Sequence, residues 1–132
     1  MTKAIDRAAL ARGLGGWGED AAAEHLVALG WQVVARNWRG EGGEIDLVAL
    51  EPVDDRPPVG VIVEVKCRSG LGFGDPLESI TYAKVSRLRK LAAEWLSQHR
   101  GLALDGVRLD AIGVLLERDR QPVLTHITGI GE

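Results

Sequence analysis

Four charged residues interrupt two apolar, strand-like segments at a spacing that would bring them together. Glu44 and Asp46 would share one face of a strand, and Glu64 and Lys66 would share one face of another, because side chains alternate along a strand. An antiparallel pairing would place the two faces side by side. Three carboxylates and one lysine are therefore expected to converge.

This set of groups suits chemistry that depends on a divalent cation. Mg²⁺ or Mn²⁺ prefers oxygen ligands and is typically held by one or two carboxylates together with waters and substrate phosphate. Asp46 and Glu64 could supply those oxygens, with the backbone carbonyl of Val65 as a third ligand. Lys66 could orient a water bound to the cation or offset charge that develops on phosphorus. A solvated sheet face is the competing explanation, and it would be preferred if only one such pair existed.

Each predicted helix also carries a charge on its apolar side. Glu19 lies near the centre of an apolar arc formed by Ala22, Ala23, Leu26, Val27 and Leu29. A carboxylate in a first helical turn is favoured by the helix dipole, so its place alone decides nothing. Lys84 lies within the arc of Val85, Leu88, Leu91, Ala92 and Trp95. There a cation opposes the dipole, and snorkelling is the alternative to a function.

Hydrophobic periodicity predicts the elements that would position these residues. We expect helices over 19–29 and from an N-cap at Thr81 to about His99, and strands over 31–36, 44–50, 61–67, 107–116 and 123–127. Proline-containing residues 51–60 and glycine-rich residues 69–76 are expected to be a hairpin-type connection and a mobile loop. The order helix-strand-strand-strand-helix-strand-strand predicts an α/β fold, a mixed central β-sheet flanked by helices.

Length and composition limit the class of protein. With 132 residues, 45% hydrophobic and 27% charged, the chain is expected to form a single domain over 1–132, with residues 1–14 as a flexible N-terminal arm. No apolar run approaches the roughly 18 residues of a membrane helix, and no signal-peptide pattern precedes the domain. Cys67 has no second cysteine to pair with. These features predict a cytoplasmic protein without a membrane partner.

Charge is segregated along the chain. The formal net charge is −3, which argues against a protein that coats nucleic acid through bulk charge. Residues 1–65 hold 6 basic and 11 acidic groups, whereas residues 66–100 hold 7 basic and 3 acidic groups. Phosphate contacts would therefore have to come mainly from the second segment.

Asp46 is followed, after an interval, by Glu64-Val65-Lys66, and this spacing resembles the PD-(D/E)XK nuclease superfamily. More closely, the chain resembles the bacterial YraN-like family, whose members are similar to archaeal Holliday junction resolvases. The matching segments lie at residues 18–20, 36–38, 43–47, 63–68, 73–74, 84, 87–88, 109–110 and 126–127. Ile45 stands where the superfamily name has proline, although this family usually lacks that proline.

The resemblance implies a restriction-endonuclease-like fold and a metal-dependent endonuclease acting on nucleic acid, with structured or branched DNA as the expected substrate. By residue, it implies Asp46, Glu64 and Glu19 as acidic ligands of Mg²⁺ or Mn²⁺ and Lys66 as the catalytic lysine. Glu44 belongs to the family pattern without an assigned role. Nucleic-acid contacts are expected from Lys84, Arg68, Arg87, Arg36 and Arg39. A resolvase-like enzyme would also be a homodimer.

Other interpretations remain open at this stage. Residues 13–18 match the dinucleotide pattern G-x-G-x-x-G, but no strand precedes them, so a flexible helix entry is preferred and no dinucleotide is expected. His25, His99 and His126 form no zinc-binding spacing. Packing is expected for Trp17, Trp38 and Trp95, with base stacking as the alternative for the first two. The main functional alternative is a non-catalytic nucleic-acid-binding or interaction module that retains the nuclease fold.

Overall fold

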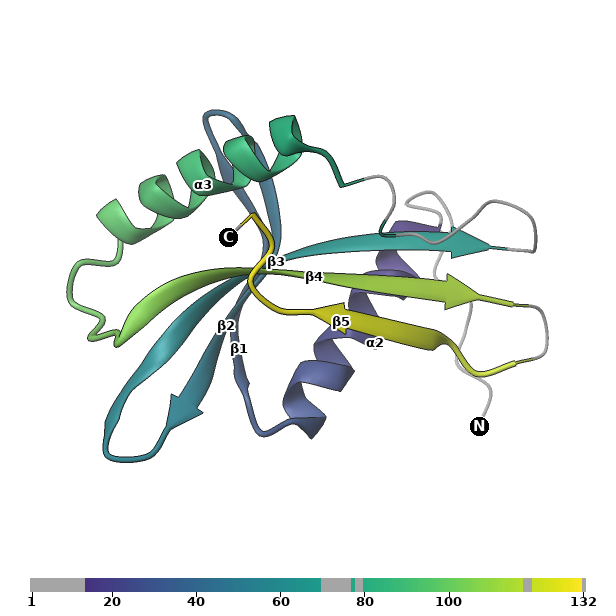
Figure 1. Ribbon diagram of the computed structural model, residues 1–132, viewed down its shortest axis with the longest axis horizontal. Coiled ribbons are helices and arrows are strands. Elements are labelled where there is room, and N and C mark those ends of the chain that lie inside the picture. Colours follow the sequence, from purple (N-terminus) through teal and green to yellow (C-terminus); the bar gives the residue numbers. More distant parts are fainter. Residues whose placement is uncertain (1–13, 70–76, 78–79, 118–119, 132) are drawn as a thin grey trace.

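The computed structural model describes residues 14–69, 77, 80–117 and 120–131. It contains two long helices, α2 (Leu14–Ala28) and α3 (Tyr82–Ser97), and a five-stranded sheet. The strands are β1 (Gln32–Gly40), β2 (Gly43–Val53), β3 (Arg56–Ser69), β4 (Gly106–Leu116) and β5 (Val123–Ile127). Figure 1 shows α3 on one face of this twisted sheet and α2 on the other. No helix within the described ranges combines the length and the apolar character needed to cross a membrane.

The sheet order is β1-β2-β3-β4-β5 and the sheet is mixed. β3 and β4 pair in parallel from Val59↔Gly106 to Ser69↔Leu116, whereas the other neighbours pair antiparallel. The parallel pair needs a crossover connection, and α3 lies within that connection. The predicted α/β class, the mixed sheet and the order of the elements are confirmed.

Each helix covers its own apolar cluster on one face of the sheet. On the α3 side, five buried helix residues pack on the sheet: Val85, Leu88, Leu91, Ala92 and Trp95. They are the arc that the sequence predicts. On the α2 side, Ala22 and Leu26 are buried against strand residues such as Val61 and Val63. Val27 and Leu29 do not join that core, because they are 60% and 49% exposed.

The helical residues begin earlier than predicted. α2 starts at Leu14 rather than at Glu19, so the glycine-rich residues up to Gly18 are helical instead of forming a flexible entry. A Cβ at Gly18 would lie 3.0 Å from Cβ and 3.1 Å from Sγ of Cys67 on β3. The glycine therefore lets the first turns of α2 approach the sheet closely. The arm expected over residues 1–14 and the loop expected over 69–76 lie almost entirely outside the described residues.

The proline-containing connection between β2 and β3 is also more regular than predicted. The strands continue to Val53 and resume at Arg56, and only Asp54 and Asp55 form the turn. Pro57 and Pro58 fit into β3 because the ladder to β2 shifts between Glu51 and Val53, where a missing N–H is tolerated.

Strand alternation fails at Asp46, which corrects the prediction that Ile45 and Leu47 share a face. Ile45 packs in the α3-side cluster, whereas Leu47 packs in the α2-side cluster. The opposing residue on β1 is Asn37, which lies between the pairs Arg36↔Leu47 and Trp38↔Ile45. Asn37 has a φ of 52°, a conformation that is uncommon for a residue other than glycine. The irregularity in the two strands thus coincides with the candidate site.

Candidate functional site

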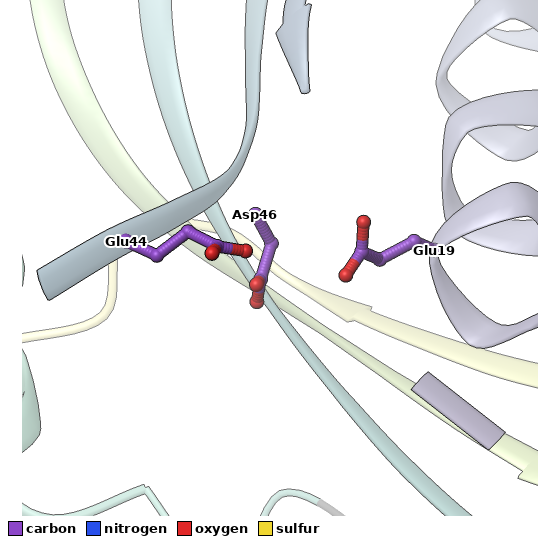
Figure 2. A group of neighbouring side chains, drawn as sticks. All are labelled: Glu19, Glu44 and Asp46. Carbon is purple, nitrogen blue, oxygen red and sulfur yellow. The ribbon is translucent and has the colours of Figure 1, made fainter. Parts of the chain in front are cut away.

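Three carboxylates meet between α2 and β2. Glu19, Glu44 and Asp46 each place one oxygen within 4.8 Å of the others. Figure 2 shows Glu19 reaching from the helix and the other two side chains reaching from the strand toward the same space. Glu19 can do so because it follows Gly18, which holds the helix close to β3. The structure therefore brings together two of the predicted acidic ligands, Glu19 and Asp46, with Glu44, which was expected nearby but without an assigned role.

Glu64 joins this group from the neighbouring strand β3. The residue is 6% exposed, and its carboxylate interacts with that of Asp46. The pairing of β2 with β3 ends at Leu47↔Val63, one step before Asp46 and Glu64. Beyond that step the Val65 N–H donates to Asp46 Oδ2 at 2.8 Å rather than extending the ladder. The side chain of Asp46 thus occupies the point where the two strands separate.

The crowding of carboxylates raises the pKa of Asp46. Burial and the neighbouring Glu64 together raise the pKa of Asp46 to about 8, against the opposing effect of the hydrogen bond from Val65. Burial also raises the pKa of Glu19, although a hydrogen bond from Asn37 and the charge of Arg36 act in the opposite direction. In this arrangement the anionic forms are disfavoured, and a cation placed among the oxygens would relieve that cost.

Two lysines lie beside the carboxylates. Lys66 Nζ is 3.7 Å from Glu64 Oε1, on the same strand. Lys84, in the first turn of α3, lies next to Lys66, and the contact with Lys66 lowers the pKa of Lys84. The contact with Lys66 thus explains why a lysine lies on the otherwise apolar side of α3 at position 84. Two adjacent ammonium groups would attract an anion, just as the adjacent carboxylates would attract a cation.

The predicted arginine contacts are distributed around this centre unequally. Arg87 lies on α3 near Lys84 and contacts the region of Gly43 at the start of β2. Arg39 is 84% exposed and 3.7 Å from Glu44. In contrast, Arg36 is held by Asp20 on α2 at 2.6 Å, so its charge is already paired. Arg68 forms a long hydrogen bond of 3.4 Å to the carbonyl of Cys67.

The hairpin that carries Glu44 is fixed against α3. The Glu41 N–H donates to both oxygens of Glu94, at 2.9 and 3.1 Å. Any side chain at Gly40 would collide with Glu94, since a Cβ there would lie 2.7 Å from its Oε1. The tip of the β1–β2 hairpin is therefore docked, and Glu44 and Arg39 have a defined place beside the carboxylates.

Sequence reasoning missed one contributor to the site, Asn37, and one aromatic position. Glu44 was expected to lie beside Asp46, but it received no role. Trp17 was expected to pack, but it is 62% exposed. Trp38 is partly buried against the α3-side cluster, and Trp95 is 3% exposed, as predicted.

Comparison with known proteins identifies the family. Residues 18–114 match the family described as "Uncharacterised protein family UPF0102". Similar proteins named "UPF0102 protein" occur in a Nocardioides species, with 45% identity over 94% of this chain and 95% of the relative. Another occurs in Mycolicibacterium smegmatis, with 47% identity over 89% of this chain and 92% of the relative. The match spans the carboxylates, both lysines and the crossover helix, and the chain belongs to the UPF0102 family.

Proposed function

We propose that this chain is a divalent-metal-dependent endonuclease of the PD-(D/E)XK type, with a restriction-endonuclease-like fold, that hydrolyses phosphodiester bonds in nucleic acid. One observation carries the proposal: a carboxylate cluster and a lysine pair lie side by side. Within each of the two groups, the like charges repel one another. A phosphodiester together with a divalent cation would satisfy both clusters at once. The Glu64–Lys66 contact joins the two at 3.7 Å.

The residues present fit Mg²⁺ or Mn²⁺. Asp46, Glu64, Glu19 and Glu44 offer the hard oxygen donors that these ions prefer, and the Val65 carbonyl is a further candidate ligand. The raised pKa of Asp46 is the expected property of a carboxylate that lacks a compensating positive charge. A bound ion would lower the pKa of a water and neutralise charge on the phosphate.

The chain's own residues would divide the remaining work. Val65 holds Asp46 in place through its N–H, and Asn37 holds Glu19 through a side-chain hydrogen bond. Lys66 and Lys84 would bind the non-bridging oxygens of the scissile phosphate and stabilise the charge that grows there. Arg87 and Arg39 would contact phosphates on either side. Structured or branched DNA is the substrate that we propose, bound by a homodimer.

The test is cleavage of branched, flapped and single-stranded DNA with Mg²⁺ or Mn²⁺, coupled to calorimetric titration of Mn²⁺. We expect cleavage by the wild type and a loss of at least about 100-fold in Asp46→Ala, Glu64→Ala and Lys66→Ala. Mn²⁺ binding should be lost in the two carboxylate variants and retained in Lys66→Ala. Asp105→Asn, at the far end of the crossover, is the matched control and should cleave normally.

Two results would overturn the proposal. Mn²⁺ binding that is equal in the wild type and in Asp46→Ala would show that the carboxylates are not a metal site. Binding of DNA with no cleavage of DNA or RNA under any of these conditions would instead favour the alternative, a non-catalytic nucleic-acid-binding module.

A further inference from the structure

A second polar centre lies on the α2 face of the sheet, and the proposed nuclease chemistry does not use it. Asp110 on β4 is fully buried. It accepts hydrogen bonds from Arg108 Nε at 2.8 Å, from Arg108 Nη2 at 3.1 Å and from the Gly129 N–H at 3.1 Å. His126 Nε2 on β5 lies 2.8 Å from the other side of this carboxylate. Burial alone would raise the pKa of Asp110, but these hydrogen bonds outweigh it and lower the pKa.

The contact with Asp110 indicates which ring nitrogen of His126 is free. The Asp110 carboxylate already accepts three N–H hydrogen bonds and also accepts from His126 Nε2, so Nδ1 keeps its lone pair in the neutral ring. That Nδ1 atom faces His25 Nε2 on α2, at 3.0 Å. A metal-bound histidine usually binds the metal through one ring nitrogen and donates the N–H of the other nitrogen to a carboxylate. The carboxylate fixes the tautomer and strengthens the ligand.

The two facing nitrogens are nearly at the spacing that a metal ion requires. With N–metal bonds of 2.0–2.1 Å, two nitrogens on a tetrahedral ion lie about 3.4 Å apart. The 3.0 Å contact is a hydrogen-bond distance, so an ion could enter only if the two rings separate by a few tenths of an ångström and turn until their lone pairs converge on it. In the present contact, His25 Nε2 carries the hydrogen and donates it to His126 Nδ1. When an ion binds, that hydrogen would move to Nδ1 of the same His25 ring. His25 Nε2 and His126 Nδ1 would then both offer lone pairs, and no proton would be lost or gained.

The surroundings favour a cation at this place. Arg108 is shared between Asp110 and Glu51, so one positive charge faces two carboxylates. His25 also lines a cavity of about 290 Å³ together with Glu24 and Gln121, two residues whose side chains carry oxygen donors.

We propose that His25 and His126 form a binding site for a d-block divalent cation such as Zn²⁺, oriented by Asp110 and separate from the carboxylate cluster. Imidazole ligands select Zn²⁺, Cu²⁺ or Ni²⁺ rather than Mg²⁺. A metal there would connect the last turn of α2 to β5. It would join residues 101 positions apart in the chain and fix the helix that carries Glu19.

Zn²⁺ titration into the full chain in the Asp46→Ala background tests this site, because that substitution removes the competing carboxylate cluster. We expect one Zn²⁺ per chain, an affinity at least about tenfold lower after His25→Gln, and no change after His99→Gln. His99 is the matched control, since it stacks on Trp95 at the end of α3, away from this pair. Cu²⁺ added to the same proteins should show imidazole nitrogen couplings in electron paramagnetic resonance, and His25→Gln should reduce them.

Equal Zn²⁺ affinity with and without His25, or Cu²⁺ spectra free of nitrogen coupling in a protein that circular dichroism shows to be folded, would overturn the site. If His25→Gln does not fold, His126→Asn provides the same comparison. Failure of this proposal leaves the proposed nuclease untouched, because Mn²⁺ binding at Asp46 is measured separately.

Discussion

At the scale of single residues, Asp46 is placed where stability and chemistry oppose each other. It is surrounded by Glu19, Glu44 and Glu64, and its pKa rises to about 8 because of burial and Glu64. A side chain selected only for the stability of the fold would not be a carboxylic acid at position 46. Asn37, with its positive φ opposite Asp46, adds backbone strain at the same place. Such local conflicts are typical of functional sites, where stability is given up for reactivity.

Asp46→Asn should therefore stabilise the protein when divalent ions are removed by a chelator. An acid whose pKa is raised on folding binds a proton in the folded state that the unfolded state has already lost. The wild type thus loses stability as the pH rises from about 4 to 8, whereas the amide does not titrate and its oxygen can still accept from Val65. We expect a gain of at least about 2 kcal/mol at pH 8 that disappears near pH 4, measured by urea unfolding.

Asp20→Asn supplies the control for this comparison. Asp20 is 67% exposed and pairs with Arg36 at the surface, so its substitution should change stability by less than about 1 kcal/mol. A gain from Asp46→Asn that is independent of pH, or a loss of stability at pH 8, would contradict the explanation from carboxylate crowding.

Residue types alone predicted much of this cluster of charged side chains and failed where the backbone is irregular. Asp46, Glu64 and Lys66 could be selected because each charge interrupts an apolar strand, and alternation is a local property. The contact between His25 and His126 could not be predicted, since it depends on α2 crossing the sheet opposite β5. The role of Asn37 depends on a positive φ, and nothing in its sequence neighbourhood distinguishes it from a turn residue.

At the scale of elements, α2 controls how close Glu19 comes to Asp46. The helix approaches β3 through Gly18, whose missing side chain leaves room for Cys67. The sequence suggested a helix that begins after the glycines, because glycine disfavours helix by about 1 kcal/mol per residue. Close packing outweighs that preference here. Because this packing depends on the tertiary structure, helix propensity alone could not predict the residue at which α2 begins.

Gly18→Ala should move the first turns of α2 away from the sheet. A methyl group at this position meets Cys67 at 3.0 and 3.1 Å, and overpacking of this kind costs about 1–3 kcal/mol. The gain in helix propensity offsets about 1 kcal/mol of that cost. We expect a lower thermal midpoint and a several-fold weaker Mn²⁺ affinity, because Glu19 moves with the helix.

Gly101→Ala is the appropriate comparison for Gly18→Ala. A Cβ at Gly101 meets nothing within 4 Å, so the same chemical change should leave both the thermal midpoint and Mn²⁺ binding close to those of the wild type. Unchanged Mn²⁺ affinity in Gly18→Ala would mean that Glu19 takes no part in the metal site.

At the scale of the whole molecule, the distribution of charge matters more than its sum. A net charge of −3 does not favour nucleic acid. However, the fold places Lys66, Lys84 and Arg87 together at the edge of the carboxylate cluster, where β3 and the start of α3 meet. The segregation of basic residues into 66–100 predicted this concentration. That these basic side chains lie next to the carboxylate cluster could be seen only after the crossover helix α3 was placed on the sheet.

Local basic charge of this kind predicts a small but specific salt dependence of DNA binding. Each phosphate contact made by a basic side chain contributes about 0.7–0.9 to the slope of log affinity against log salt. The double substitution Lys84→Ala and Arg87→Ala should therefore lower the slope by nearly 2 and weaken binding at least about tenfold at low salt. Fluorescence anisotropy with labelled DNA and Ca²⁺ in place of Mg²⁺ would measure binding with cleavage suppressed.

A double substitution that removes the same charge elsewhere separates local from bulk electrostatics. Arg56 and Arg120 are 67% and 76% exposed, and within the described part of the chain they form long surface ion pairs with Asp105 and Glu117. Replacing both with alanine changes the net charge by the same two units and should leave the slope unchanged. An equal decrease of the slope in both double variants would mean that DNA senses only the total charge. The edge formed by Lys66, Lys84 and Arg87 would then not be the binding surface.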